Sequence, residues 1–223
     1  MDAVEINKGR EVLYNFLFKS LEDAPDKEYI KMFKNLSAYL SELLDDENND
    51  ELTKAKEIFL NYKNMLKSES EEDELLLELK RRYTRLFYLG GMSVPMYESV
   101  YLSPERILKQ EPWEEVIKIF RENRFAPPKK GNYPEDHIAF ELLFMSFLSD
   151  FAVDYAENED ETNLYAIYQK QKGFLEDHLL KWVDLFSDRV LKTADGDSFY
   201  AGIVLLLKNY VKEDYEFLLS GLE

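Results

Sequence analysis

Hydrophobic side chains recur along almost the whole chain at the three- and four-residue spacing of an α-helix. The clearest run has members at relative positions 0, 3, 4, 7, 8 and 11: Phe140, Leu143, Phe144, Phe147, Leu148 and Phe151. Ile138, Leu142 and Met145 fill the opposite side of this run. A helix that is apolar nearly all round is typical of a buried central position. No segment alternates with the period of a β-strand, so the pattern predicts an all-α fold, a compact multi-helix bundle of about nine or ten helices.

The helical pattern is interrupted at several places. Paired glycines, Gly90 and Gly91, end one helix, since glycine tolerates the left-handed conformation of a C-cap. Residues 89–112 form the longest stretch with weak helical periodicity, and their apolar content argues against disorder, so we expect a functional loop. Residues 126–132 contain Pro127, Pro128 and Gly131 and form a candidate hinge. We expect residues 1–223 to form a single domain.

The amino-acid composition excludes several kinds of functional site and partner. The 223 residues include no cysteine, which excludes disulfides, thiolate metal sites, iron–sulfur ligation and a cysteine nucleophile. The formal net charge of −17 repels nucleic acid and anionic membranes, and it attracts a basic partner. The same acidity also has a simpler reading, which is solubility. No export signal and no membrane-spanning segment is visible in the sequence.

The first candidate motif combines a helix end with a loop. Tyr83, Leu86 and Phe87 share one face of a helix, which by periodicity alone indicates ordinary core packing. The loop that follows carries Pro95, Tyr97 and Glu98, a rigid proline, an aromatic ring and a carboxylate. Such a set suits a groove for an extended or amphipathic peptide. The Glu98 carboxylate would either receive an arginine of the partner or accept backbone N–H groups and fasten the loop.

The second candidate motif lies at the start of the apolar central run. Asp136 and His137 follow a proline that suits a first helical turn, and Glu141 stands four residues after His137. That spacing predicts that the Glu141 carboxylate orients the imidazole and that Asp136 caps the helix. The alternative is a structural cluster that ties the long loop to the central helix. The other histidine, His178, we interpret as a packing residue.

Taken in this order, the two motifs resemble the TorD/DmsD/NarJ family of redox-enzyme maturation chaperones. The position of Met96 departs mildly from the family pattern. The resemblance implies a cytoplasmic, all-helical protein that holds the catalytic subunit of a molybdoenzyme, often by its twin-arginine leader peptide, until the cofactor is in place. It implies a peptide-binding site formed by Tyr83, Leu86, Phe87, Pro95, Tyr97, Glu98, Asp136, His137 and Glu141. It also implies a homo-oligomer formed by helix exchange, for which residues 126–132 would be the hinge.

Two alternatives remain beside the leader-binding chaperone. One is a NarJ-like helical scaffold that binds a redox-enzyme subunit that is not exported. The other is a hydrolase built on the carboxylates and histidines. Neither histidine lies three residues after a glutamate, as a di-metal helical bundle requires, and no nucleophile elbow is present. We therefore expect no catalysis, no cofactor and no metal.

Overall fold

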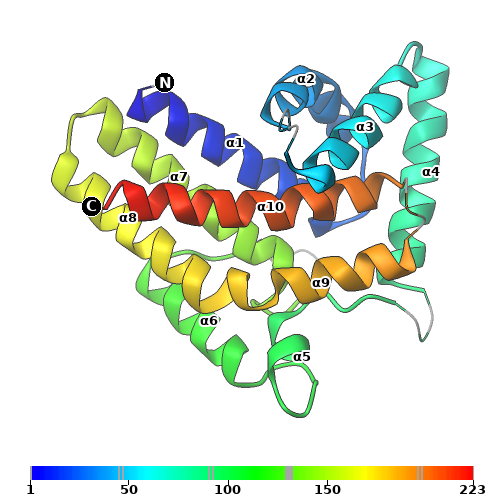
Figure 1. Cartoon of the computed structure of the whole chain (residues 1–223). Helices are drawn as coiled ribbons and strands as arrows, with labels where there is room; N and C mark the ends of the chain where they lie inside the picture. Colours follow the sequence, from blue (N-terminus) through cyan, green and yellow to red (C-terminus); the bar gives the residue numbers. More distant parts are fainter. Residues whose placement is uncertain are drawn as a thin grey trace. The chain divides into compact units, whose positions relative to one another are not determined.

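A computed structural model describes residues 2–44, 46, 48–89, 91, 93–128, 133–194, 196 and 198–222. Over these ranges the chain is built from helices α1 to α10, and the sole β-type pairing is an isolated bridge between Tyr97 and His137 (Figure 1). This confirms the all-α prediction. Gly90, expected to end a helix, and residues 129–132 of the candidate hinge lie outside the described residues. None of the helices in the described ranges is long and apolar enough to cross a lipid bilayer.

The chain divides into two compact units. The first unit comprises Met1–Phe18, Met96–Val183 and Val211–Glu223, and the second comprises Lys19–Pro95 and Asp184–Tyr210. Three of the four divisions fall within helices, namely α1 (Ala3–Glu22), α9 (Leu180–Thr193) and α10 (Phe199–Ser220), and the fourth lies between Pro95 and Met96. A single domain over residues 1–223 stays a prediction.

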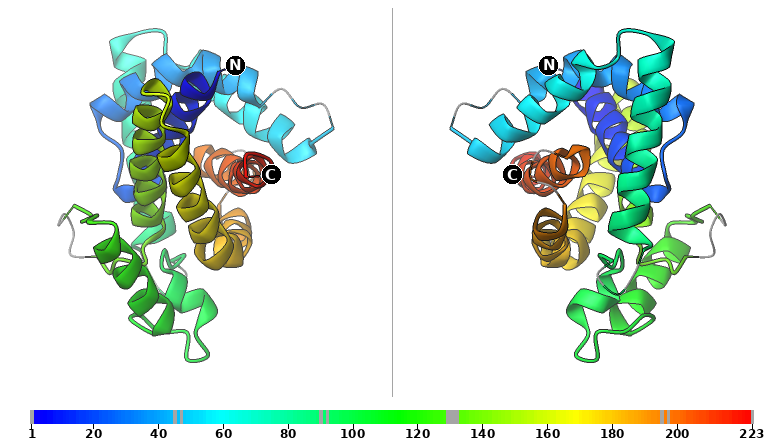
Figure 2. Two further views of the ribbon diagram at one scale, coloured as in Figure 1. Left: turned by 90° about the vertical axis from the view of Figure 1, so that its left-hand side faces the viewer. Right: turned by 90° about the vertical axis from the view of Figure 1, so that its right-hand side faces the viewer.

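The first unit is organised around α7 (Ile138–Glu157). This helix packs against α8 (Glu161–Phe174), which follows it after a short turn (Figure 2). Phe144 of α7 contacts Phe174 at 4.8 Å between ring centroids and Phe120 of α6 (Glu111–Glu122) at 4.9 Å. Most α7 side chains are buried, which confirms that the apolar run forms a central helix.

A buried ion pair also lies in the first unit. The Arg10 guanidinium donates to both carboxylate oxygens of Asp214, and both side chains are almost fully buried. The Tyr14 hydroxyl donates to the same carboxylate at 2.6 Å. Nη1 of the same guanidinium donates hydrogen bonds to the side-chain oxygens of Asn7 and Gln171, at 2.8 and 2.9 Å. Each charge therefore has hydrogen-bonding partners that offset its removal from water.

The second unit contains α2 (Lys27–Leu43), α3 (Asp50–Asn64) and α4 (Glu69–Phe87). Each of these helices begins at a side-chain cap that accepts backbone N–H groups: Asp26, Asn49 and Ser68. The core is a group of aromatic rings in edge-to-face contact: Phe33, Phe59, Tyr62 and Phe199. Gly202 allows the close approach beside them, since a Cβ atom there would lie 3.0 Å from Ile58 and Phe59 side-chain atoms.

Candidate peptide-binding site

The loop motif and the start of α7 meet in the first unit. Tyr97 and His137 form the antiparallel bridge, the Glu98 N–H donates to the Asp136 carbonyl at 3.0 Å, and the Ile138 N–H donates to the Met96 carbonyl at 2.9 Å. The two segments thus run side by side, although 37 positions separate Ser99 from Asp136. The structure brings the end of the first motif, Tyr97 and Glu98, together with Asp136 and His137 of the second motif.

Asp136 and His137 each serve a helix N-terminus. The short helix α5 (Glu98–Leu102) has no cap of its own, and the Asp136 carboxylate instead accepts the Ser99 N–H at 2.9 Å. His137 is the N-cap of α7, and its Nδ1 accepts the Ala139 N–H at 3.2 Å. The prediction that Asp136 caps the following helix was wrong, because the histidine takes that role and the aspartate turns to α5.

Glu98 and Glu141 lie in a buried polar cluster together with two residues from later in the chain, His178 and Trp182. The Glu98 carboxylate is 3.0 Å from Nδ1 of His178, and Glu141 accepts the Trp182 indole N–H at 3.1 Å. The predicted pairing of Glu141 with His137 is replaced by the Trp182 contact. The four-residue rule holds within a helix, whereas His137 has an extended backbone and precedes α7.

Burial sets the charge of these groups. It raises the pKa of Glu98 and of Asp136, and it raises the pKa of Glu141 well above the ordinary value, to which the nearby Glu98 charge adds. One oxygen of Asp136 and one of Glu141 have no hydrogen-bond partner in the described part of the chain. Burial also lowers the pKa of His137 to about 3, so its imidazole is neutral at pH 7. Because Nδ1 accepts a hydrogen bond, the proton of the neutral ring lies on Nε2.

A π-helical turn positions His178. The turn η2 (Leu175–Leu179) separates α8 from α9. Such turns insert an extra residue into a helix and change the direction of the side chains, often at functional sites. The His178 ring stacks on Phe174 at 4.9 Å and reaches Glu98. Sequence reasoning treated His178 as packing, although its four-residue spacing to Trp182 was an available signal.

The accessible part of the cluster is aromatic. Tyr97 and Tyr133 are half-buried, and both rings contact His137, at 5.1 and 5.0 Å between centroids. Burial raises the pKa of Tyr97 to about 12, which keeps its phenol neutral. Glu98, Asp136 and Glu141 are each at most 1% exposed, so they position this surface without forming it. Tyr133 is not among the site residues predicted from the sequence.

The remaining candidate residues belong to the second unit. Tyr83, Leu86 and Phe87 are buried in the last turns of α4, and the Tyr83 hydroxyl donates to the Leu21 carbonyl at 3.1 Å. The Leu86 carbonyl accepts the Val94 N–H at 2.8 Å, and Pro95 is half-buried. In this structure the three α4 residues are buried packing residues, which is the interpretation that their periodicity alone indicated.

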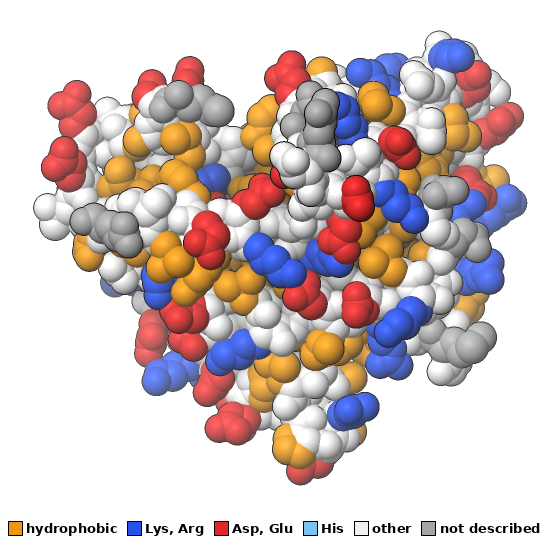
Figure 3. All heavy atoms as spheres, viewed as in Figure 1, with side chains coloured by type: hydrophobic (Ala, Val, Ile, Leu, Met, Phe, Trp, Pro, Cys, Tyr) orange, Lys and Arg blue, Asp and Glu red, His pale blue; other side chains and the backbone are white. Residues whose placement is uncertain are grey.

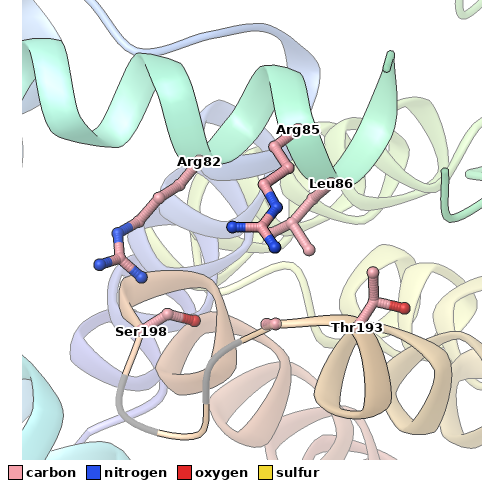
Figure 4. Close-up of a pocket in the computed structure, with 6 residues that line it drawn as sticks. Arg82, Arg85, Leu86, Thr193 and Ser198 are labelled. Carbon is pink, nitrogen blue, oxygen red and sulfur yellow. The ribbon is translucent and has the colours of Figure 1, made fainter. Parts of the chain in front are cut away.

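A small hollow in the second unit lies beside Leu86. It is lined by residues of α4 and of the segment between α9 and α10: Arg82, Arg85, Leu86, Thr193, Ala194 and Ser198. Figure 4 shows the guanidinium groups of Arg82 and Arg85 extending from α4 toward that segment. The hollow holds about 20 Å³, which is room for one water molecule and not for a peptide side chain.

The fold and the candidate site together define an all-helical protein in which half-buried aromatic rings lie over a buried cluster of acidic side chains. The family model described as the nitrate reductase delta subunit matches residues 22–188. The chain belongs to this family, the TorD/NarJ family.

Several curated relatives carry the name chaperone protein TorD. The protein from Photobacterium profundum is 32% identical over 171 residues, covering 76% of each chain. That from Psychrobacter sp. is 30% identical over 143 residues, covering 64% of this chain and 62% of its own. That from Vibrio vulnificus is 23% identical over 217 residues, covering 96% of each chain. The relatives are thus named as chaperones, which is a non-catalytic role.

Proposed function

We propose that the protein is a cytoplasmic maturation chaperone. It binds the leader peptide or the apo-form of the catalytic subunit of a molybdopterin-dependent oxidoreductase, and it holds that subunit until cofactor insertion and before twin-arginine export. The observation that supports this proposal most is the convergence of residues 96–99 and 136–138 in a family of chaperones. It fixes partly exposed aromatic rings on a rigid, hydrogen-bonded base.

In this proposal the buried and the accessible residues have different roles. Tyr97 and Tyr133 contact the apolar part of the leader, while Glu98, Asp136, His137 and Glu141 hold the loop in place. The net charge of −17 attracts the basic end of a twin-arginine leader. Tyr83, Leu86, Phe87 and Pro95 remain proposed members of the peptide-binding set in the second unit.

The mechanism is one of mass action. A leader bound to the chaperone is not available to the export machinery, and an apo-subunit bound to it is kept from aggregation. Release requires that the mature, cofactor-loaded subunit bind more weakly than the apo-form, because a ligand shifts an equilibrium only by its difference in affinity.

A second candidate function is supported by the family description. The matched model describes the delta subunit of nitrate reductase. In this alternative the protein is a scaffold for a redox-enzyme subunit that is not exported, and its contacts are with the mature subunit instead of a leader.

A binding titration tests the proposal. Fluorescently labelled twin-arginine leader peptides from the source organism are titrated with wild type, Tyr97→Ala and Tyr165→Ala. Tyr165 is a matched control, since it is an exposed tyrosine on α8 away from the two motifs. We expect micromolar or tighter binding to one leader, a loss of roughly tenfold in Tyr97→Ala and little change in Tyr165→Ala.

Two results would count against this proposal. If Tyr97→Ala and wild type bind the leader equally well, Tyr97 and its neighbours in the first unit do not form the leader-binding site. Binding of the mature apo-subunit without its leader, together with no binding of any leader, would favour the scaffold alternative.

A further inference from the structure

An aromatic row runs along the accessible side of α7. Phe147, Phe151 and Tyr155 follow one another at four-residue spacing, with ring centroids 4.9 and 6.3 Å apart. Phe125 extends the row, at 5.2 Å from Phe147. Phe151 is 37% exposed, and the other three rings are half-buried. Phe144 and Leu148 of the same helix are each only 1% exposed and contribute to the core, whereas the rings of the row are partly accessible.

An acidic row lies beside the aromatic row. Asp150 and Asp154 are exposed, and each stands three residues after a phenylalanine of the row, which places them on adjacent positions of the helix surface. Neither carboxylate has an ion-pair partner among the described residues. Glu11 of α1 is close to Asp150, since its pKa is raised by partial burial and then by the Asp150 charge. The nearby Lys8 is already paired with Glu157.

The two rows together have the chemistry of a receptor for basic side chains. A guanidinium group can lie over an aromatic face and direct its N–H groups to a carboxylate at the same time. Apolar side chains on the next turn of the same partner would cover the rings. Carboxylates that have no ion-pair partner within the described ranges, next to partly exposed rings, are complementary in charge and polarity to one kind of ligand, a basic amphipathic helix.

We propose that this surface, the α7 stripe (Phe125, Phe147, Asp150, Phe151, Asp154 and Tyr155), binds a basic amphipathic helical segment of a partner protein. The partner's identity rests on the proposed function, under which the segment belongs to the mature part of the client subunit. The stripe is then a second contact that retains the client independently of the leader.

The test uses the full-length protein and a synthetic probe. The probe is a fluorescein-labelled helical peptide with leucines four residues apart and arginines three residues after each leucine, which mirrors the two rows. A scrambled peptide of equal charge is the control ligand. The protein variants are Phe151→Ala and the double variant Asp150→Asn with Asp154→Asn. The control double variant is Glu111→Gln with Glu115→Gln, which removes two exposed carboxylates at the same spacing from α6.

We expect the ordered probe to bind wild type roughly tenfold more tightly than the scrambled peptide. Phe151→Ala and the Asp150/Asp154 double variant should each weaken it by roughly tenfold, and the Glu111/Glu115 double variant by less than about twofold. Equal losses in the two double variants would mean attraction by net charge alone and would overturn the proposal, as would equal binding of the scrambled peptide.

Leader peptides titrated against the same variants separate the two proposals. Under both proposals, Tyr97→Ala weakens leader binding and leaves probe binding unchanged. If every variant of the stripe loses leader binding, the stripe is part of the leader-binding site, and the proposal of a second, independent contact is overturned. If wild type binds the ordered probe but no leader, the proposed function is contradicted and the proposed binding by the α7 stripe is supported.

Discussion

Arg10 is expected to contribute strongly to the stability of the first unit. Its guanidinium is buried and pairs with both oxygens of Asp214. Arg10→Met leaves the Asp214 charge buried without a counter-ion, and we expect a loss of about 3–5 kcal/mol in the free energy of unfolding. Urea denaturation at pH 7 measures this.

A double variant, Arg10→Met with Asp214→Leu, separates the ion pair from packing. It should recover most of the loss, because replacing both partners by apolar groups avoids an isolated buried charge. Lys8→Met removes the exposed pair with Glu157 and should leave the unfolding midpoint unchanged. A loss below about 1 kcal/mol in Arg10→Met would contradict the prediction.

Glu141 makes stability depend on pH on the alkaline side. Its pKa in the folded protein lies well above the ordinary value of 4.5, mainly through burial. A carboxyl group with a raised pKa stabilises the fold below its unfolded pKa, and this contribution is lost as the pH rises through the folded pKa. Glu141→Gln keeps a neutral acceptor for Trp182, so the variant should gain stability relative to wild type as the pH rises. Urea denaturation between pH 5 and 8 tests this, and parallel profiles would rule it out.

His137 acts in the opposite direction. Its folded pKa of about 3 lies below the ordinary value of 6.5. A histidine with a lowered pKa contributes stability that is lost as the pH falls from about 6.5 toward 3, with a slope of at most about 1.4 kcal/mol per pH unit. His137→Asn keeps a side chain that can cap α7 and should flatten this slope. Thermal melts from pH 7 to 4 measure it, and an unchanged slope would show that His137 does not cause it.

At the scale of the element, the π-turn is the feature that fixes the geometry of the acid cluster. Deleting the exposed Glu176 shortens η2 by one residue and converts it to regular α-helix. His178 then turns by about one helical position away from Glu98, so the pair at 3.0 Å is lost. We expect a lower melting temperature and weaker leader binding, checked by calorimetry and by the peptide titration.

The control for the deletion is a substitution at the same position. Glu176→Ala keeps the length of the turn and should retain both properties, although it removes the exposed pair with Lys172. Equal behaviour of the deletion and the substitution would contradict a role for the turn.

The elements were largely predictable from the sequence, because helical periodicity and caps are local properties. The apolar run at Phe140–Phe151 predicted the central position of α7. The partners within the candidate site were not predictable in the same way. Glu98 meets His178, and Glu141 meets Trp182, through contacts between segments 80 and 41 positions apart. No local pattern specifies such pairs.

At the scale of the whole molecule, the chain is strongly acidic, with a formal net charge of −17. The face in Figure 3 shows acidic and basic side chains interspersed, with hydrophobic groups between them. A net charge of this size attracts a basic partner over a long range.

Leader binding should accordingly depend on ionic strength. Raising the salt concentration from roughly 0.05 to 0.5 M shortens the screening length and should slow association, while the apolar contact with Tyr97 persists. Stopped-flow fluorescence measures the association rate. The loss caused by Tyr97→Ala should be similar at both salt concentrations. An association rate that does not change with salt would contradict steering by charge.

The dependence of α5 on Asp136 has a consequence for synthesis of the chain. A helix of five residues does not persist alone in water, and α5 borrows its N-terminal hydrogen-bond acceptor from a residue 37 positions later. On the ribosome, α5 therefore acquires its native form only after the start of α7 has emerged. A nascent chain that ends before residue 136 carries Tyr97 but lacks the segment that holds it, so the candidate binding surface forms only after residue 137 has been synthesised.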